Sequence, residues 1–210
     1  NCHAYGKVEG KTGAMAAGIC ARGSNSTFIN CTNNAEISGS GPCWLGGIVA
    51  DSTYNNIQGC INNGKLKFLE NDNFHPAYYN APAGGIVGLS KGDQLQHCTN
   101  NADAICSTTN YVGGIAGYFI DYTSKIDKCV NNGRILGFNG VGGIVGLLSD
   151  GATVMECKNN SSHIEATYDP QDKVCSHYDQ PKNKIYVGEI IGINKNDEEV
   201  RKTYDWNFHI

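Results

Sequence analysis

Charged residues are scarce in this chain. Asp, Glu, Lys and Arg make up 17% of its 210 residues, and the formal net charge is −4. A protein that binds nucleic acid regardless of base sequence needs a positively charged face that displaces counterions from phosphates. The composition therefore argues against nucleic acid as a partner.

Long apolar segments are missing as well. No apolar run approaches the roughly 18 residues that a membrane-spanning helix needs, so we expect no membrane insertion from this chain. Proline is rare, with 5 residues, whereas glycine is frequent, with 27. Together with the many asparagines, this composition predicts numerous tight turns between short strands.

The sequence is rich in one short motif, Gly-Gly-Ile-Val-Gly. Its isoleucine occurs in six copies, two of them degraded, at Ile19, Ile48, Ile86, Ile115, Ile144 and Ile190. The steps between these isoleucines are 29, 38, 29, 29 and 46 residues. A recurrent period in this range is typical of a stacked-repeat architecture.

A second motif, Cys-x-Asn-Asn, follows the first five copies after 12 to 14 residues. Its cysteines are Cys31, Cys60, Cys98, Cys129 and Cys157, and its first asparagines are Asn33, Asn62, Asn100, Asn131 and Asn159. A third apolar piece follows, around Ile37, Leu66, Ile135 or Ile164. None of the pieces is long enough for a helix, and β-branched pieces bounded by turn residues indicate strands.

These patterns predict an all-β fold, a parallel β-helix (β-solenoid) of about six turns. Each turn has about 29 residues and three short strands, because one unit cannot bury its apolar side alone but stacked units can. Equivalent residues then lie above one another, about 4.8 Å apart. We expect the recurring isoleucine to point inward and the glycines to mark a wall where other groups approach closely.

Stacking gives structural roles to the repeated cysteines and to the repeated asparagines. The motif cysteines should form a buried column of packed thiols, and the asparagines should bond between turns at a corner with left-handed backbone angles. A line of thiols does not suit tetrahedral Zn²⁺, so we expect no metal and no cofactor. The cysteines outside the register are the better candidates for a disulfide, with the pairing open: Cys20, Cys43, Cys106 and Cys175.

Two insertions, 67–83 and 166–186, interrupt the solenoid region 1–196 at the same point of the repeat. They should emerge from one edge and form a rim. Residues 197–210 are expected to cap the solenoid or form an edge strand, and further repeats are expected on the N-terminal side. Aromatic and imidazole groups of the insertions and the tail are candidate ligand-binding residues: Tyr78, Tyr79, His75, Tyr178, His177 and Trp206.

No catalytic group stands out from the sequence. Cys175, Ser176 and His177 have the residue types of a thiol enzyme, but adjacent residues of a strand do not face one another. We therefore predict no enzymatic activity.

The two motifs together resemble the GLUG-motif repeats of bacterial surface and secreted proteins over residues 2 to 192. The chain departs from that pattern at Glu189, which replaces a glycine. The resemblance implies an extracellular module on a bacterial cell surface. Together with the aromatic insertions it predicts a structural or adhesive role, with a glycan or a host surface protein as partner at the edge that carries the insertions. The alternatives are a β-helical carbohydrate-active enzyme, such as a polysaccharide lyase or hydrolase, and an accessory domain of a secreted peptidase.

Overall fold

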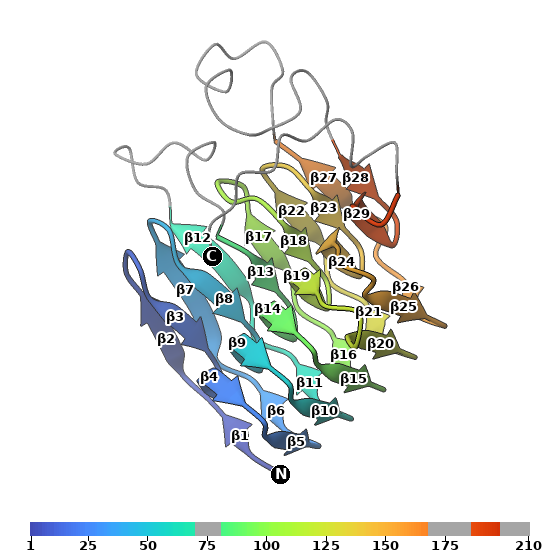
Figure 1. Cartoon of the computed structure of the whole chain (residues 1–210). Coiled ribbons are helices and arrows are strands. Elements are labelled where there is room, and N and C mark those ends of the chain that lie inside the picture. Colours follow the sequence, from blue (N-terminus) through green and yellow to red (C-terminus); the bar gives the residue numbers. More distant parts are fainter. Residues whose placement is uncertain (70–80, 168–185, 198–210) are drawn as a thin grey trace.

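The computed structural model describes residues 1–69, 81–167 and 186–197. In these ranges the chain forms 29 strands and no helix. Every strand pair between turns is parallel, and the chain climbs by one rung per repeat (Figure 1). The prediction of an all-β parallel β-solenoid is confirmed, with five complete turns from β1 to β25 and the start of a sixth from β26 to β29.

The strands form five parallel sheets, which we name sheets A to E. Sheet A contains β1 (His3–Ala4), β6 (Thr32–Asn33), β11 (Ile61–Asn62), β16 (Thr99–Asn100), β21 (Val130–Asn131) and β26 (Lys158–Asn159). Sheet B contains β2 (Lys7–Gly10), β7 (Glu36–Ser40), β12 (Leu66–Leu69), β17 (Ala104–Cys106), β22 (Ile135–Gly137) and β27 (Ile164–Ala166).

The other three sheets complete each turn. Sheet C contains β3 (Met15–Ala17), β8 (Trp44–Gly46), β13 (Ala83–Gly84), β18 (Val112–Gly113), β23 (Val141–Gly142) and β28 (Val187–Gly188). Sheet D contains β4 (Cys20–Ser24), β9 (Val49–Thr53), β14 (Val87–Lys91), β19 (Ala116–Ile120), β24 (Val145–Leu148) and β29 (Ile191–Asn194). Sheet E contains β5 (Thr27–Ile29), β10 (Asn56–Gln58), β15 (Gln94–Gln96), β20 (Lys125–Asp127) and β25 (Thr153–Met155).

Each turn therefore has five strands instead of the three expected from the sequence. The Gly-Gly-Ile-Val piece is divided between two sheets. Its first glycine, Gly46, ends β8 in sheet C, and its valine, Val49, begins β9 in sheet D. The Cys-x-Asn piece supplies the strand of sheet A, which is only two residues long. A strand this short has no periodicity of its own, which is why the sequence indicated a turn there.

The interior of the described chain holds two large apolar clusters and a small one around Tyr111, Leu147 and Ile193. The larger of the two large clusters lies between sheets D and E and contains the motif isoleucines Ile48, Ile86, Ile115 and Ile144, all fully buried. The other large cluster lies between sheets B and C and contains residues such as Ile37, Leu66 and Ile135. The inward orientation expected for the recurring isoleucine is confirmed at these four rungs.

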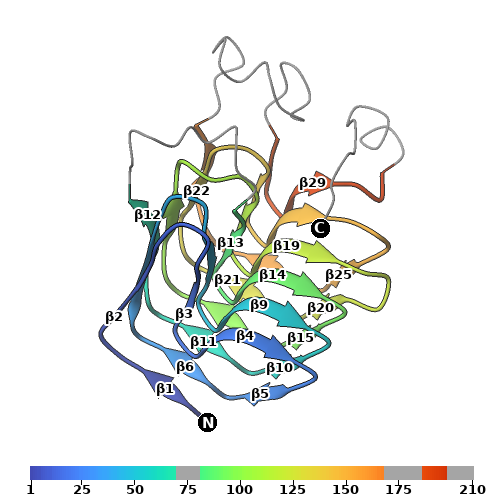
Figure 2. The same ribbon diagram turned by 60° about the vertical axis from the view of Figure 1, so that its left-hand side comes forward.

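Sheets D and E meet in a row of tight turns, which we call the D–E corner (Figure 2). Because both sheets line the same apolar cluster, their other faces point away from it. Both gaps in the described chain fall between sheets B and C, after β12 and after β27, which lie three rungs apart in sheet B.

Candidate functional site: the ladders and the outer face of sheet E

The first motif asparagines form a buried ladder through the molecule. The Nδ2 of Asn33 donates to Oδ1 of Asn62 at 2.8 Å, and the same bond repeats from Asn62 to Asn100, from Asn100 to Asn131 and from Asn131 to Asn159. Each Nδ2 also donates to the carbonyl two residues ahead, as Asn62 does to Gly64 at 3.0 Å. Each Oδ1 accepts an amide from that residue. An internal amide therefore uses both donors and both lone pairs, which removes the cost of burying it.

A glycine column faces this ladder. A Cβ placed on Gly114 would lie 2.1 Å from the carbonyl oxygen of Gly143 in the next turn and 2.3 Å from Cγ of Asn131. The same conflict with a ladder asparagine occurs at Gly47, with Asn62, and at Gly85, with Asn100. The two sequence motifs therefore contact each other. Because the glycine has no side chain, it leaves the space that the buried asparagine amide fills. This confirms the expected close approach at the glycines.

The departure at Glu189 has a structural reason. Glu189 occupies the glycine position of the last described turn, and its side chain is exposed. The ladder ends at Asn159, which lies against the preceding glycine, Gly143. Among the described residues no further ladder asparagine follows Glu189, so a side chain meets no amide there.

The second motif asparagines form another ladder, on the surface. Here Nδ2 of Asn63 donates back to Oδ1 of Asn34 at 3.0 Å, and the pattern repeats at Asn101, Asn132 and Asn160 with donor–acceptor distances of 2.7 to 2.9 Å. The outer ladder therefore donates toward the N-terminal turn, whereas the inner one donates toward the C-terminal turn. The predicted bonding between turns is confirmed for both asparagines of the motif.

Left-handed backbone angles are not found at these asparagines, and that part of the prediction is wrong. Positive φ angles stack instead immediately before each motif cysteine, at Asn30 (51°), Gly59 (62°), His97 (53°), Lys128 (53°) and Glu156 (48°). A second column of positive φ angles lies at the D–E corner and includes Tyr54 at 52°. The two columns sit at the two ends of the sheet E strands, where the chain reverses sharply. The first asparagine of each motif instead ends a strand of sheet A.

The motif cysteines form the expected buried column at four rungs. Cys31, Cys60, Cys98 and Cys129 are buried, and Cys157 is half-buried. Each thiol donates to the carbonyl two residues before it, for example Cys98 to Gln96 at 3.4 Å. Hydrogen bonds with the thiols of Cys129 and Cys60, together with burial, raise the pKa of Cys98 well above its usual value. The thiol of Cys98 is therefore held protonated and acts as a packing group, because only the thiolate is a strong nucleophile or metal ligand. Thiol–thiol hydrogen bonds lower the pKa of both its neighbours, that of Cys60 through Cys98 and that of Cys129 through Cys157 and Cys98.

The cysteines outside the column are free wherever the structure describes them. Cys20 is half-buried, while Cys43 and Cys106 are buried in the cluster between sheets B and C. Burial raises the pKa of Cys43 to about 11. Cys175, the fourth candidate for a disulfide, lies outside the described residues.

The D–E corner contains a buried polar group that the sequence did not indicate. Asn55 and Asp93 occupy the same position in consecutive turns, and each bonds the serine three residues before it: Asn55 Nδ2 donates to Ser52 Oγ at 2.7 Å, and Ser90 Oγ donates to Asp93 Oδ2 at 2.5 Å. Asp93 Oδ1 also accepts the backbone amide of Asn55 at 2.7 Å. Burial raises the pKa of Asp93 to about 6 despite these hydrogen bonds.

The outer face of sheet E is built from the alternate residues of five three-residue strands. The first column is Thr27, Asn56, Gln94, Lys125 and Thr153, and the second is Ile29, Gln58, Gln96, Asp127 and Met155. The residues between them point into the core: Ile57, Leu95 and Ile126 are fully buried. The face is therefore a regular two-column array with a rung spacing of about 4.8 Å.

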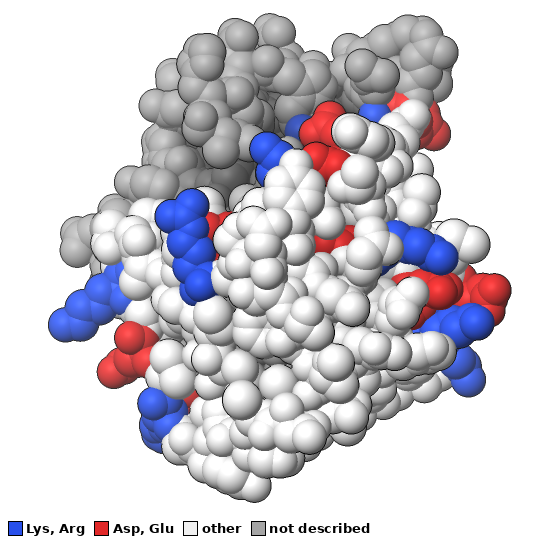
Figure 3. Space-filling model, turned by 60° about the horizontal axis from the view of Figure 1, so that its bottom comes forward, with Lys and Arg blue, Asp and Glu red and all other residues white. Residues whose placement is uncertain are grey.

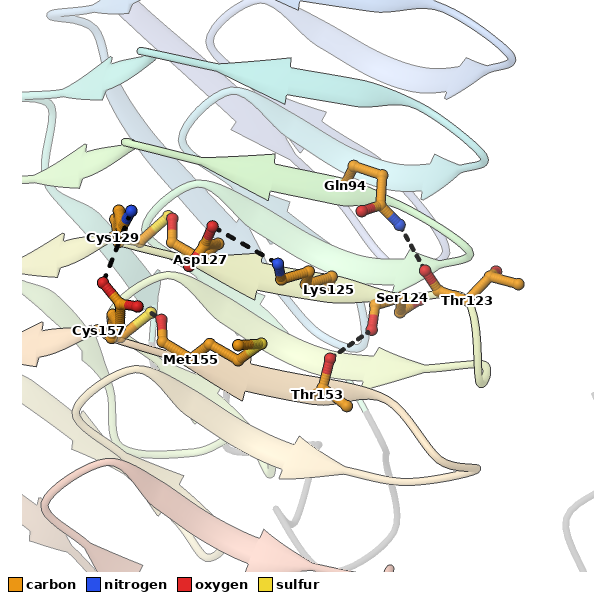
Figure 4. Close-up of polar contacts among 11 residues, drawn as sticks. Gln94, Thr123, Ser124, Lys125, Asp127, Cys129, Thr153, Met155 and Cys157 are labelled. Atoms are coloured by element: carbon orange, nitrogen blue, oxygen red, sulfur yellow. Dashed lines mark hydrogen bonds and ion pairs between the residues drawn. The ribbon is translucent and has the colours of Figure 1, made fainter.

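Side-chain contacts tie part of this face to the D–E corner (Figure 4). Gln94 Nε2 donates to the carbonyl oxygen of Thr123. Lys125 Nζ lies 3.6 Å from Asp127 Oδ2 on the same strand, and Thr153 Oγ1 bonds the carbonyl of Ser124 at 3.5 Å. Beside the face, Lys128 Nζ lies 3.6 Å from Glu156 Oε2.

All six residues proposed from the sequence as ligand-binding groups, His75, Tyr78, Tyr79, His177, Tyr178 and Trp206, lie outside the described residues. Two tyrosines at the D–E corner were not singled out. Tyr122 is 81% exposed and Tyr54 is 50% exposed. The ring of Tyr54 covers Gly92 of the next turn, where a Cβ would lie 2.2 Å from Cδ1 and Cε1. The signal for Tyr122 in the sequence was the break of the repeat at this corner, which is two residues longer before β20 than before β15. Tyr54 lies in a turn of the usual length and had no such signal.

Within the described ranges, no cluster of three or more His, Cys, Asp or Glu side chains is placed to hold a metal ion. The same part of the chain contains no helix that is long and apolar enough to cross a membrane. No known protein family, curated protein or solved structure matches this chain. The fold and the geometry above are therefore the basis for a functional argument, and they define the chain as a β-solenoid repeat protein.

Proposed function

We propose that this chain is a stiff, non-enzymatic module of a secreted or surface-exposed bacterial protein, and that it acts by adhesion to a glycan or a host protein. The observation that carries the proposal is the use of the two repeated motifs. Their glycines face the first asparagines inside the coil and their cysteines pack in the larger apolar cluster, so the repeat specifies a continuous structure rather than a reactive centre.

Rigidity follows from the way in which the rungs are joined. Bending the coil between two turns would break backbone bonds in five sheets together with one bond of each asparagine ladder. These bonds are coupled, since each buried amide bonds the rung on either side. A module of this kind holds whatever it carries, or whatever it binds, at a fixed distance. The resemblance to GLUG-motif repeats supports an extracellular setting for such a role.

The polar side chains of the described residues favour binding over catalysis. The buried Asp93 is held by Ser90 and by the amide of Asn55, with no second acid or base placed across a cleft from it. Asp51, its nearest acidic neighbour in the same sheet corner, is paired with Arg22 at 2.9 Å. Glycoside cleavage in most families requires two carboxyl groups on either side of the scissile bond.

The test uses the complete chain on a panel of soluble polysaccharides and a panel of host extracellular-matrix proteins. Binding is followed by biolayer interferometry, and cleavage is followed by reducing-end release and by ultraviolet absorbance of unsaturated products. We expect saturable binding to at least one target and no cleavage. Turnover of any polysaccharide that scales with protein concentration and survives repurification would overturn the proposal.

A further inference from the structure

The outer face of sheet E differs from an ordinary polar surface in the balance of its charges. Its first three rungs carry no charged group, and the fourth carries Lys125 and Asp127, which neutralise each other at 3.6 Å. Lys128 and Glu156 at its margin are paired in the same way. Figure 3, with the bottom of the molecule brought forward, shows a wide area without charged side chains and adjacent blue and red groups at its right-hand margin. Such a face exerts no long-range attraction on polyanions or polycations.

The same face has unused hydrogen-bonding capacity. Asn56, Gln58 and Gln96 present amide side chains in two adjacent columns, and within the described chain these amides have no hydrogen-bond partner. Each amide offers two donor hydrogens and an acceptor oxygen. The fourth amide, Gln94, is held by the carbonyl of Thr123 and fixes the corner loop beside the array. Unpaired amide groups therefore stand on two adjacent rungs of this face.

Aromatic rings flank this array at the D–E corner. Tyr122 precedes the residue that Gln94 binds, and it is the most exposed large side chain among the described residues. Tyr54 is held in place, because its ring lies over Gly92 of the next turn. Tyrosine presents a large apolar ring with a polar end and loses little conformational freedom on binding.

We infer that the outer face of sheet E, with Tyr54 and Tyr122 at its edge, is the adhesive surface of this module and binds a neutral polysaccharide. A hydroxyl is both donor and acceptor, so a row of sugar hydroxyls matches a row of amides, and the apolar face of a sugar ring matches tyrosine. A protein partner would be expected to need an apolar centre, but the apolar residues Ile29 and Met155 stand at opposite ends of the second column. The inference rests on the proposed function and assigns it a ligand class and a location.

The experiment compares the wild type with three variants of the complete chain by affinity electrophoresis. The gels contain a mixed-linkage β-glucan, a galactomannan, an α-mannan or dextran, with polygalacturonate and heparin as anionic counterparts. The face variant is Asn56→Ala with Gln58→Ala and Gln96→Ala, and the ring variant is Tyr122→Ala. The matched control is Tyr5→Ala, because Tyr5 is 75% exposed on a corner between sheets A and B. Circular dichroism and Tm establish that each variant is folded.

We expect retardation of the wild type by at least one neutral polysaccharide and by neither anionic one. The face variant should weaken that binding at least tenfold and the ring variant severalfold, while Tyr5→Ala should leave it unchanged. Equal binding by the wild type and the face variant would overturn the inference and leave adhesion through another surface intact. Binding only to the anionic polymers, or to none of the six, would also overturn it. Cleavage of a polysaccharide that slows the migration of the wild type would instead overturn the proposed function.

Discussion

The inner asparagine ladder and the D–E corner solve the same problem in different ways. Both bury polar side chains where the chain turns between sheets. The ladder uses one residue type at all five positions from Asn33 to Asn159. The D–E corner uses a different residue at nearly every rung, namely Ser26, Asn55, Asp93, Ser124 and Ala152.

The contrast follows from where the hydrogen bonds go. A ladder amide bonds the amides above and below it, so each rung must supply a side chain of the same length that carries both a donor and an acceptor. At the D–E corner the bonds between turns join a side chain to the backbone, as when Asp93 accepts the backbone amide of Asn55, and the bonds between side chains stay mainly within a turn, as from Ser90 to Asp93. A backbone amide is present at every rung whatever the residue, so such a bond places no demand on the side chain of the neighbouring rung. Bonds between side chains of successive turns therefore enforce repetition of a residue, and bonds to the backbone or within a turn permit variation.

The largest effect should come from a charge placed in the cysteine column. Cys129→Asp introduces a carboxylate where the side chain is fully buried, and no cation is placed to pair with it. We expect a loss of about 5 kcal/mol of unfolding free energy, because an uncompensated buried charge is among the most destabilising changes. Cys129→Val keeps an apolar group of similar size and should cost less than about 1.5 kcal/mol. Urea denaturation of both variants tests the burial of the column, and equal stability of the two would contradict it.

The second largest effect should come from a change in the inner asparagine ladder. Asn100→Ala removes the acceptor for Asn62 and the donor for Asn131, and it leaves both neighbours buried with an unsatisfied group. We expect a loss of about 4 kcal/mol, since each orphaned buried polar group costs about 1–3 kcal/mol. The control is Asn101→Ala in the outer ladder, where water replaces the lost bonds and the cost should stay near 1 kcal/mol. The comparison would break down if the two alanine variants had the same denaturation midpoint.

The D–E corner should tolerate an exchange between its own residue types. Asp93→Asn copies the residue that stands one turn earlier, at Asn55. Burial raises the pKa of this carboxyl to about 6 in the folded wild type, whereas in the unfolded chain the pKa is the ordinary aspartate value of 3.8. The wild type therefore loses unfolding free energy as the pH rises from about 4 to about 6. The loss is at most about 3 kcal/mol, because each unit of pKa shift corresponds to about 1.36 kcal/mol. The variant has no carboxyl at this position and should not show the loss.

Unfolding free energies at pH 4 and pH 7 measure this difference. The asparagine variant should match the wild type at pH 4 and exceed it at pH 7. The reverse exchange, Asn55→Asp, should destabilise at pH 7 and become milder at pH 4. A variant at position 93 that is less stable than the wild type at both pH values would show that the carboxylate is required there.

The smallest effect concerns the left-handed column before the cysteines. His97 has φ 53°, and the same position one turn earlier is Gly59. His97→Gly should raise stability by about 0.5–1 kcal/mol, because glycine adopts this angle without strain. His97→Val should lower it by about 1 kcal/mol or more, since a β-branched residue is poorly accommodated at positive φ. Thermal unfolding checks the sign, and a gain for valine would contradict the backbone argument.

The sequence was sufficient to predict the fold because the contacts between turns leave a period. Gly-Gly-Ile-Val-Gly and Cys-x-Asn-Asn recur together because Gly85 and Asn100, for instance, fill one space. The division of a turn into five strands was missed, since strands as short as Thr32–Asn33 carry no pattern. The left-handed positions were missed because they hold Asn, Gly, His, Lys and Glu in turn.

The candidate binding face was less accessible to sequence reasoning. The strands of sheet E have three residues each, so their outward side chains follow no recognisable alternation. Only the register that places Asn56 beside Gln94 and Gln58 beside Gln96 reveals the amide array. The exposed Tyr122 depends on an extended corner loop whose place on the surface is set by Thr123 and Gln94. The residues favoured from the sequence, such as Tyr78 and Trp206, remain a prediction.

A double-mutant cycle on the buried ladder tests most directly that equivalent residues of successive copies are bonded neighbours. Asn62 and Asn100 lie on adjacent rungs with a 2.8 Å bond, whereas Asn33 and Asn131 are three rungs apart. From alanine single and double variants we expect a coupling energy of about 1–2 kcal/mol for the adjacent pair and less than about 0.5 kcal/mol for the distant pair. Additive effects for Asn62 and Asn100 would contradict the stacked ladder, and with it the architecture on which the binding face depends.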